Sequence, residues 1–131
     1  MNKTDNHLKM MSGVMAAFAA DALALGVHWV YDVARIKERY GRLDHLTVPE
    51  IAPFHKNRQK GDFTHYGDQM LVLLESLGHC NGFELEDFAA RWQALFDHYD
   101  GYLDKATKTA LSHFQAGRSP AAAGSDSSDL G

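Results

Sequence analysis

The chain has 131 residues, 45% of them hydrophobic, which is enough for one domain with a buried core. Its formal net charge of −4 argues against a nucleic-acid-binding protein. The single cysteine, Cys80, excludes an intramolecular disulfide framework and fits a reducing compartment, so we expect a cytoplasmic protein.

The first helix is predicted over residues 8–25, after a loose polar segment and before Gly26 as its stop signal. No apolar run reaches the roughly 18 to 20 residues that a membrane-spanning helix needs, so we expect a soluble protein without a membrane partner. Two lysines precede the apolar run 14–20, as in a secretory signal sequence. That run is rich in alanine and is followed by Asp21, which disfavours this alternative.

Asp21 shares a helical face with three apolar residues, Val14, Phe18 and Leu25. A carboxylate on a face that is otherwise buried must accept hydrogen bonds or have its pKa raised. Two interpretations stay open. We favour a network that ties the helix to a neighbouring loop, because such networks often place acids on apolar faces; the other interpretation is a binding-site residue.

Residues 27–31 form a compact aromatic exit from the first helix, with His28 as their one strongly polar member. A histidine in such a setting is more often a packing residue than a ligand or base. Asp32 is placed to cap a short helix over residues 33–40, which Gly41 ends. Three side chains are expected on the inner side of that helix: Val33, Ile36 and Tyr40.

Residues 42–60 contain two prolines and keep no period, which predicts a long surface connection. Such connections often serve as binding loops or lids. Three basic side chains near its end are either solvated or suited to a phosphate-bearing ligand: Lys56, Arg58 and Lys60.

The densest group of chemically active side chains lies in residues 61–77, GDFTHYGDQMLVLLESL. The first half reads as a loop, and the leucines of the second half recur at the spacing of a core helix. Asp68 lies where that helix is expected to begin, where a carboxylate faces free backbone N–H groups. Such a helix end also binds anions. The candidate site residues here are Thr64, His65, Tyr66, Asp68 and Gln69.

Two further amphipathic helices are predicted, over residues 85–99 and 102–116, with Gly101 between them. The residues of the first of these that we expect in the core are Leu85, Phe88, Ala89, Trp92, Leu95, Phe96 and Tyr99. Residues 117–131 are rich in glycine, serine and aspartate and are expected to form a flexible tail. Because no stretch alternates with period two, the predicted fold class is all-α.

Two segments resemble signature segments of the ADP-ribosylglycohydrolase family. Residues 20–29, ADALALGVHW, resemble the family's glycine-aspartate-alanine-leucine-glycine opening. Residues 61–77 resemble its threonine-aspartate-aspartate-threonine-glutamine-methionine segment, which also begins a helix. Residues 99–111 resemble a helix start of the family, and residues 124–131, GSDSSDLG, resemble the beginning of its small-residue binding loop. That loop would bring Gly124, Ser125 and Asp126 to a ligand.

The resemblance implies an all-α, orthogonally packed multi-helix domain, of which residues 1–131 are an N-terminal part. It implies an enzyme that hydrolyses an N- or O-linked ADP-ribosyl group on a protein or small molecule. Two magnesium ions are the implied cofactors, held by acidic and threonine side chains of both motifs and by later aspartates. If the helix over residues 85–99 normally packs on segments outside this chain, its exposed apolar face favours a homo-oligomer.

Aligned without gaps, the chain replaces the family's acidic residue and its threonine-aspartate-aspartate by His28, His65, Tyr66 and Gly67. Asp68 takes the place of the second threonine, and Gln69 and Met70 match. Magnesium prefers hard oxygen ligands in octahedral geometry, which these replacements do not supply. The sequence therefore predicts that the usual two-magnesium motif is altered.

Three interpretations of function stay open. In the first, the protein is a hydrolase in which Asp68 acts as base or acid with His65 or His28, a pairing that contributes about 10²- to 10⁴-fold to a rate. In the second, it binds ADP-ribose or another nucleotide without cleaving it. The ligand-binding candidates are Tyr66, Gln69, Asp21, Thr64, Gly124, Ser125 and Asp126. In the third, it is structural, as in lens crystallins that resemble this family.

A zinc site is a further alternative for the histidines of this chain. His28, His55 and His65 offer imidazole ligands that can combine with Asp68. None of these histidines has a partner at the i, i+4 helical spacing of an HExxH motif, so the pattern is a weak zinc signal.

Overall fold

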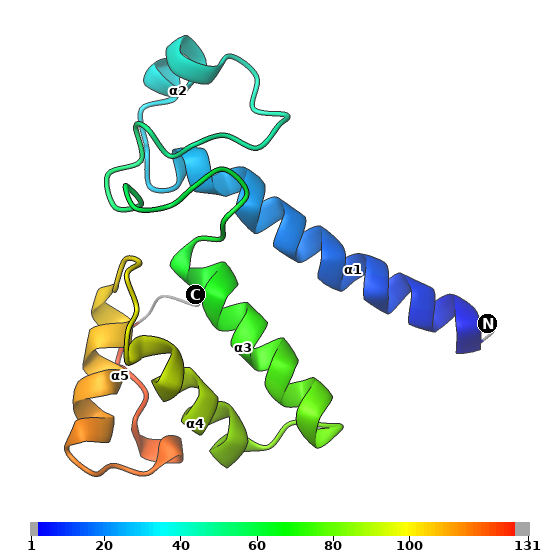
Figure 1. Cartoon of the computed structure of the whole chain (residues 1–131), viewed down its shortest axis with the longest axis vertical. Coiled ribbons are helices and arrows are strands. Elements are labelled where there is room, and N and C mark those ends of the chain that lie inside the picture. Colours follow the sequence, from blue (N-terminus) through cyan, green and yellow to red (C-terminus); the bar gives the residue numbers. More distant parts are fainter. Residues whose placement is uncertain (1–2, 128–131) are drawn as a thin grey trace. The chain divides into compact units, whose positions relative to one another are not determined.

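The computed structural model describes the backbone of residues 3–127 (Figure 1). Within this range the chain forms helices and no strand, which confirms the predicted all-α class. The elements are α1 (Lys3–Ala24), the 3₁₀ helix η1 (Leu25–Val27), α2 (Val33–Tyr40), α3 (His65–Cys80), α4 (Leu85–Phe96), α5 (Lys105–Gln115) and the 3₁₀ helix η2 (Pro120–Ala122). The chain divides into two compact units, unit 1 (Met1–Gly67) and unit 2 (Asp68–Gly131). The orthogonal arrangement of the whole bundle stays a prediction.

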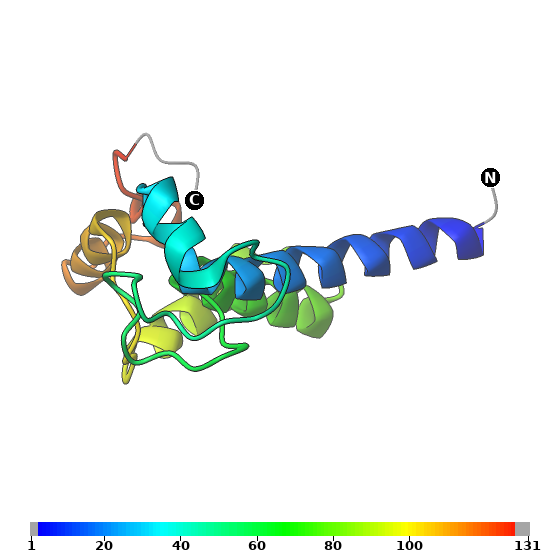
Figure 2. The same ribbon diagram turned by 90° about the horizontal axis from the view of Figure 1, so that it is seen from above.

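Helix α1 begins five residues earlier than predicted, because its polar start is helical rather than loose. Asp5 and Lys9 form an ion pair of 2.8 Å at i, i+4, a spacing that supports the first turns of a helix. Figure 2 shows α1 as one unbroken helix. At the C-terminal end of α1, the 3₁₀ helix η1 continues the helical course through Gly26. A Cβ atom at Gly26 would lie 1.9 Å from Thr47 Oγ1, so a side chain does not fit there.

The segment Asp5–Val27 is long and apolar enough to cross a membrane, by length and composition alone. This corrects the expectation that no run in the chain reaches that length. Signal sequences and core helices of soluble proteins pass the same test, so the signal-sequence alternative stays open. Five large apolar side chains of α1 are exposed in the structure: Leu8, Met10, Met11, Val14 and Met15.

Helix α2 has the predicted bounds. The Asp32 carboxylate accepts the Arg35 backbone N–H at 3.1 Å, and Gly41 ends the helix with a φ of 68°. The prediction that Val33 faces inward is wrong, since its side chain is 73% exposed. Polar contacts rather than apolar burial therefore hold this short helix.

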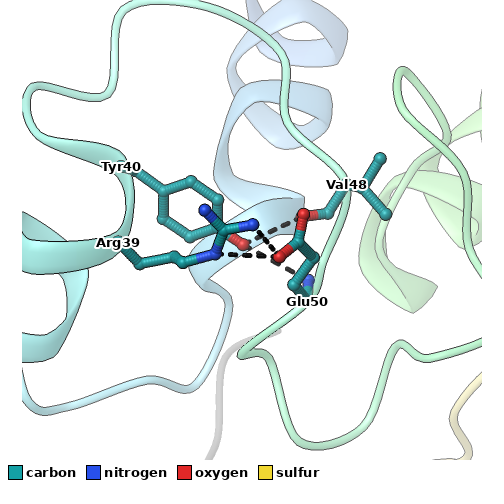
Figure 3. Close-up of polar contacts among 4 residues, drawn as sticks. All are labelled: Arg39, Tyr40, Val48 and Glu50. Atoms are coloured by element: carbon teal, nitrogen blue, oxygen red, sulfur yellow. Dashed lines mark hydrogen bonds and ion pairs between the residues drawn. The ribbon is translucent and has the colours of Figure 1, made fainter.

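These polar contacts tie α2 to the long connection of residues 41–64 (Figure 3). The Tyr40 hydroxyl donates to the Val48 carbonyl at 2.9 Å and accepts the Glu50 backbone N–H at 3.2 Å. Arg39 donates to the Glu50 carboxylate through Nε, at 2.8 Å, and through its terminal nitrogen. These hydrogen bonds therefore hold part of the long connection against α2, although the connection has no hydrophobic periodicity.

In unit 2, Trp92 is the centre of the aromatic packing. Its ring lies 4.7 Å from Phe96 on the same helix and 6.0 Å from Phe114 on α5. Trp92 and Ala89 are buried, as predicted, whereas Leu85 is 36% exposed and the core prediction for it is wrong. Helix α4 ends at Phe96, three residues before its predicted end.

Helix α5 starts at Lys105 rather than at residue 102, because Asp104 caps it. The Asp104 carboxylate accepts the Thr107 backbone N–H at 2.6 Å. Beyond α5, residues 117–127 of the predicted flexible tail are described, while residues 128–131 lie outside the described part. Ala123 is only 1% exposed, and the His113 ring nitrogen Nδ1 lies 3.0 Å from its carbonyl oxygen. Flexibility of the tail stays a prediction.

Candidate functional site

Asp21 fixes the start of α3. Its carboxylate accepts the Thr64 backbone N–H at 2.8 Å and the Thr64 hydroxyl at 2.7 Å. The same Thr64 oxygen accepts the Tyr66 backbone N–H at 3.1 Å, so Thr64 is the N-cap of α3. The network between helix and loop that the apolar-face carboxylate predicted is present. Because Thr64 caps the helix, Asp68 lies within its first turn and not at its cap.

Gly67 is required by this network. A Cβ atom at that position would lie 2.2 Å from Asp21 Oδ2 and 2.7 Å from the Cβ of Phe63, closer than atoms can approach. The Asp21 carboxylate therefore occupies the space that a side chain at position 67 needs. A carboxylate ligand at position 67 is incompatible with the observed contact between Asp21 and Thr64.

Three histidines from separate segments of unit 1 meet in what we call the histidine cluster: His28, His55 and His65. His28 follows η1, His55 lies in the long connection, and His65 is the first residue of α3. His28 Nδ1 and His55 Nε2 share a hydrogen bond of 2.7 Å. One candidate ligand nitrogen from each ring lies within 4.8 Å of the other two.

Aromatic rings surround the histidine cluster. The Tyr66 ring packs 4.0 Å from His65 and meets His28 edge-on at 5.6 Å. Trp29 lies 5.6 Å from His28 and packs against Phe54 at 5.2 Å. Trp29 adopts a φ of 62°, a left-handed conformation that is uncommon for a bulky residue. Two of the three histidines are almost completely buried, with exposed fractions of only 2% for His55 and 1% for His65.

Burial makes protonation of the cluster unfavourable. Desolvation, followed by the positive charges that His28, His65 and Arg58 would carry, lowers the pKa of His55 from 6.5 to about 4. Desolvation also lowers the pKa of His28, with a further contribution from His65 and opposition from Asp21. At neutral pH both rings are therefore uncharged and present lone pairs.

Metal-free protein should lose stability as the pH falls from about 6.5 toward about 4. In this pH range His55 binds a proton in the unfolded chain but stays neutral in the folded protein. We expect His55 to account for about 2 to 3 kcal/mol of unfolding free energy across this window. Urea unfolding at several pH values, with a chelator present, measures it. His55→Gln should make the profile shallower and leave the contribution of His28, whereas His45→Gln, at an exposed histidine, should not change it. An unchanged profile in His55→Gln would contradict the assignment.

In unit 2, two predicted site residues are held by aromatic side chains. The Tyr99 hydroxyl donates to Asp68 Oδ2 at 2.6 Å, and the Trp92 indole N–H donates to Gln69 Oε1 at 2.7 Å. Gln69 also lines a pocket of about 200 Å³ together with Trp92, Asp104, Ala106, Thr107, Ala110, Ser125 and Ser127. Of the predicted ligand residues, Gln69 and Ser125 thus share one cavity.

The predicted site residues fall into two groups. Unit 1 holds Asp21, His28, Thr64, His65 and Tyr66, and unit 2 holds Asp68, Gln69, Gly124, Ser125 and Asp126. Gly124 lines a separate, apolar pocket of about 160 Å³, and Asp126 lines neither of these two pockets. The pairing of Asp68 with His28 or His65 stays a prediction.

Sequence reasoning missed several residues of these sites. Asp104 and Thr107 were not singled out, although an aspartate just before a helical apolar pattern is a readable N-cap signal. His55 entered only as a zinc ligand, since it lies between residues without period. Tyr99 was placed in the core without its hydrogen bond to Asp68.

A family model described as ADP-ribosylglycohydrolase matches residues 2–131. The chain belongs to the ADP-ribosylglycohydrolase family. It is 30% identical to crystallin J1A of Tripedalia cystophora over 93 residues and 30% identical to crystallin J1B of the same animal over 92 residues. Each match covers 67% of this chain and 27% of the relative, so the chain spans about a quarter of the length of these curated relatives. No solved structure matches the chain.

The magnesium ions that the ADP-ribosylglycohydrolase resemblance implies do not fit the described residues. The aligned positions carry His28, Tyr66 and Gly67, and none of these supplies a carboxylate. The carboxylate of Asp21 is engaged by both donors of Thr64. The nitrogen-rich donor set of the histidine cluster suits other divalent ions better than magnesium.

Proposed function

We propose that the chain contributes to a hydrolase that removes an ADP-ribosyl group from a protein or small molecule without the two-magnesium centre of its family. The observation that carries this proposal is the family match over residues 2–131. A cytoplasmic location belongs to the same proposal and rests on the single cysteine. The activity is proposed for the whole protein, because this chain corresponds to about a quarter of its curated relatives.

Asp68 is the proposed general base. Its place in the first turn of α3 sets the carboxylate at the positive end of the helix, and the Tyr99 hydroxyl fixes its orientation at 2.6 Å. In the proposed reaction, Asp68 takes a proton from a water molecule as the water oxygen bonds to the anomeric carbon of the ribose. The bond from that carbon to the leaving nitrogen or oxygen breaks, and the leaving atom gains a proton from solvent or from the protonated carboxyl group.

The pocket of unit 2 is the proposed recognition site for one part of the ADP-ribosyl group. Its volume of about 200 Å³ lies below the roughly 300 to 1,000 Å³ of complete small-molecule sites, so it suits a ribose or phosphate alone. Gln69, Thr107 and Ser125 offer polar groups that hydrogen-bond to hydroxyl or phosphate oxygens. Tyr66 is a weaker candidate for stacking on the adenine, because its ring already packs on His65.

A structural role is the second candidate function. Binding of ADP-ribose without hydrolysis is an intermediate possibility, because it keeps the ligand but not the reaction. The similarity to two proteins named crystallin favours the structural role, and so does the replacement of the acidic metal-ligand positions. This role makes the pocket of unit 2 incidental. It therefore predicts no affinity for ADP-ribose.

Calorimetric titration with ADP-ribose, together with an assay for ADP-ribose release from an ADP-ribosylated peptide, separates the candidates. We expect saturable heat, and product release that added magnesium does not stimulate. Heat without product would overturn the hydrolase in favour of a binding protein. Neither heat nor product would overturn both and leave the structural role.

A further inference from the structure

The histidine cluster has the composition and spacing of a metal site. A tetrahedral zinc ion with Zn–N bonds of 2.0 to 2.1 Å holds its ligand nitrogens about 3.3 Å apart. The nitrogens of the cluster lie within 4.8 Å of one another, and the pair from His28 and His55 is 2.7 Å apart. The required spacing lies between these values, so displacements of the ring nitrogens by roughly 1 Å suffice to close the site around an ion.

Burial reduces the competition of protons with a metal ion at this cluster. Desolvation disfavours the imidazolium form of a buried histidine, so such a ring keeps a lone pair available to a metal. The rings come from three segments that are distant in sequence, so one ion would join the exit of α1, the long connection and the start of α3. An ion bound there stabilises unit 1 by linking these three segments.

The existing hydrogen bond is compatible with this role. One of the nitrogens His28 Nδ1 and His55 Nε2 carries the proton they share, and metal binding requires both lone pairs. That proton then moves to the second nitrogen of the same ring. The hydrogen bond that is lost is worth about 1 kcal/mol, much less than three metal–nitrogen bonds provide.

A second group of potential ligands, His79, Cys80 and Asp87 in unit 2, is a poorer site. His79 is exposed, and the Asp87 carboxylate is engaged by Ser76 and Arg91, both at 2.7 Å. The Arg91 hydrogen bond, with that of Ser76, lowers the pKa of Asp87 to about 2. A cation at this place would compete with an arginine that already neutralises the carboxylate.

We propose that His28, His55 and His65 bind one divalent transition-metal ion, zinc being the representative, with a remaining coordination position for water or another ligand. Imidazole nitrogens suit zinc, cobalt, nickel and copper, whereas magnesium requires oxygen. Three protein ligands and one open position are the arrangement of catalytic rather than closed structural zinc sites. The inference stands independently of the ADP-ribosyl reaction, since it concerns binding of the metal alone.

The test uses chelator-treated protein titrated with zinc or magnesium chloride, with bound metal and melting temperature as readouts. We expect one equivalent of zinc and a raised melting temperature, and neither effect from magnesium. His28→Gln should weaken zinc binding at least about 100-fold, more than loss of outer-shell partners does, while His79→Gln leaves it unchanged. Failure to bind zinc, or loss of binding in His79→Gln alone, would overturn the proposal.

Cobalt substitution identifies the site in the unaltered protein and so does not depend on the variants folding. Cobalt held by imidazole nitrogens shows visible bands of four- or five-coordinate geometry without the near-ultraviolet charge-transfer band of a cobalt–thiolate bond. We expect this nitrogen-only spectrum. A thiolate band would place the ion at Cys80 and contradict the assignment to the histidine cluster.

Discussion

Asp68→Asn is expected to lower the rate of ADP-ribosyl hydrolysis by about 100- to 10,000-fold, which is the range that general acid–base catalysis contributes. Asparagine keeps the size of the side chain and an oxygen that accepts the Tyr99 hydroxyl, but its amide cannot take a proton from water. The fold and the affinity for ADP-ribose should therefore change little. Single-turnover release of ADP-ribose measures the chemical step apart from binding.

Asp97→Asn is the matched control. Asp97 is an exposed carboxylate at the C-terminus of α4, so the substitution removes the same charge from unit 2 without touching the pocket. Its rate should equal that of the unaltered protein. An Asp68→Asn variant as active as the Asp97→Asn variant would show that Asp68 is not the base.

Asp21→Ala should lower the unfolding free energy by about 2 to 3 kcal/mol. The substitution removes a charged acceptor from both donors of Thr64, and Thr64 is 1% exposed, so water does not easily replace the lost bonds. The N-cap of α3 loses its support as well. Urea denaturation followed by circular dichroism measures the loss.

The controls for Asp21→Ala lie on the same helix and in the same network. Asp5→Ala removes an exposed carboxylate from α1 and should stay within about 0.5 kcal/mol. Thr64→Val removes the hydroxyl but keeps the backbone donor, and the double variant with Asp21→Ala should lose less than the sum of the two. Strict additivity would mean that the two side chains do not act as a pair.

Helix ends that depend on residues next to them in sequence could be predicted from the sequence. Asp32 and Gly41 carry cap chemistry that specified both ends of α2 from sequence alone. The start of α3 was different, because Thr64 and Asp68 are both acceptable cap residues. The choice between them depends on Asp21, which lies 43 positions before Thr64 and reaches it only in the folded unit.

In the candidate site, too, some residues could be recognised from their sequence neighbours and others only from contacts made in the fold. His28 and His65 stand out in sequence because each lies next to a helix end. His55 does not, and only the course of the long connection brings it within 2.7 Å of His28. The contacts of Gln69 with Trp92 and of Asp68 with Tyr99 join residues 23 and 31 positions apart, which no local pattern encodes.

The chain carries His28, His65, Tyr66 and Gly67 at the positions aligned with the implied magnesium ligands. Two of them, His28 and His65, belong to the histidine cluster, and Gly67 lies against the carboxylate of Asp21. Calorimetric titration of magnesium chloride into metal-free protein measures whether magnesium binds at these positions. We expect only heats of dilution and an unchanged melting temperature. Saturable binding of one or two magnesium ions, with the protein stabilised as they bind, would contradict it.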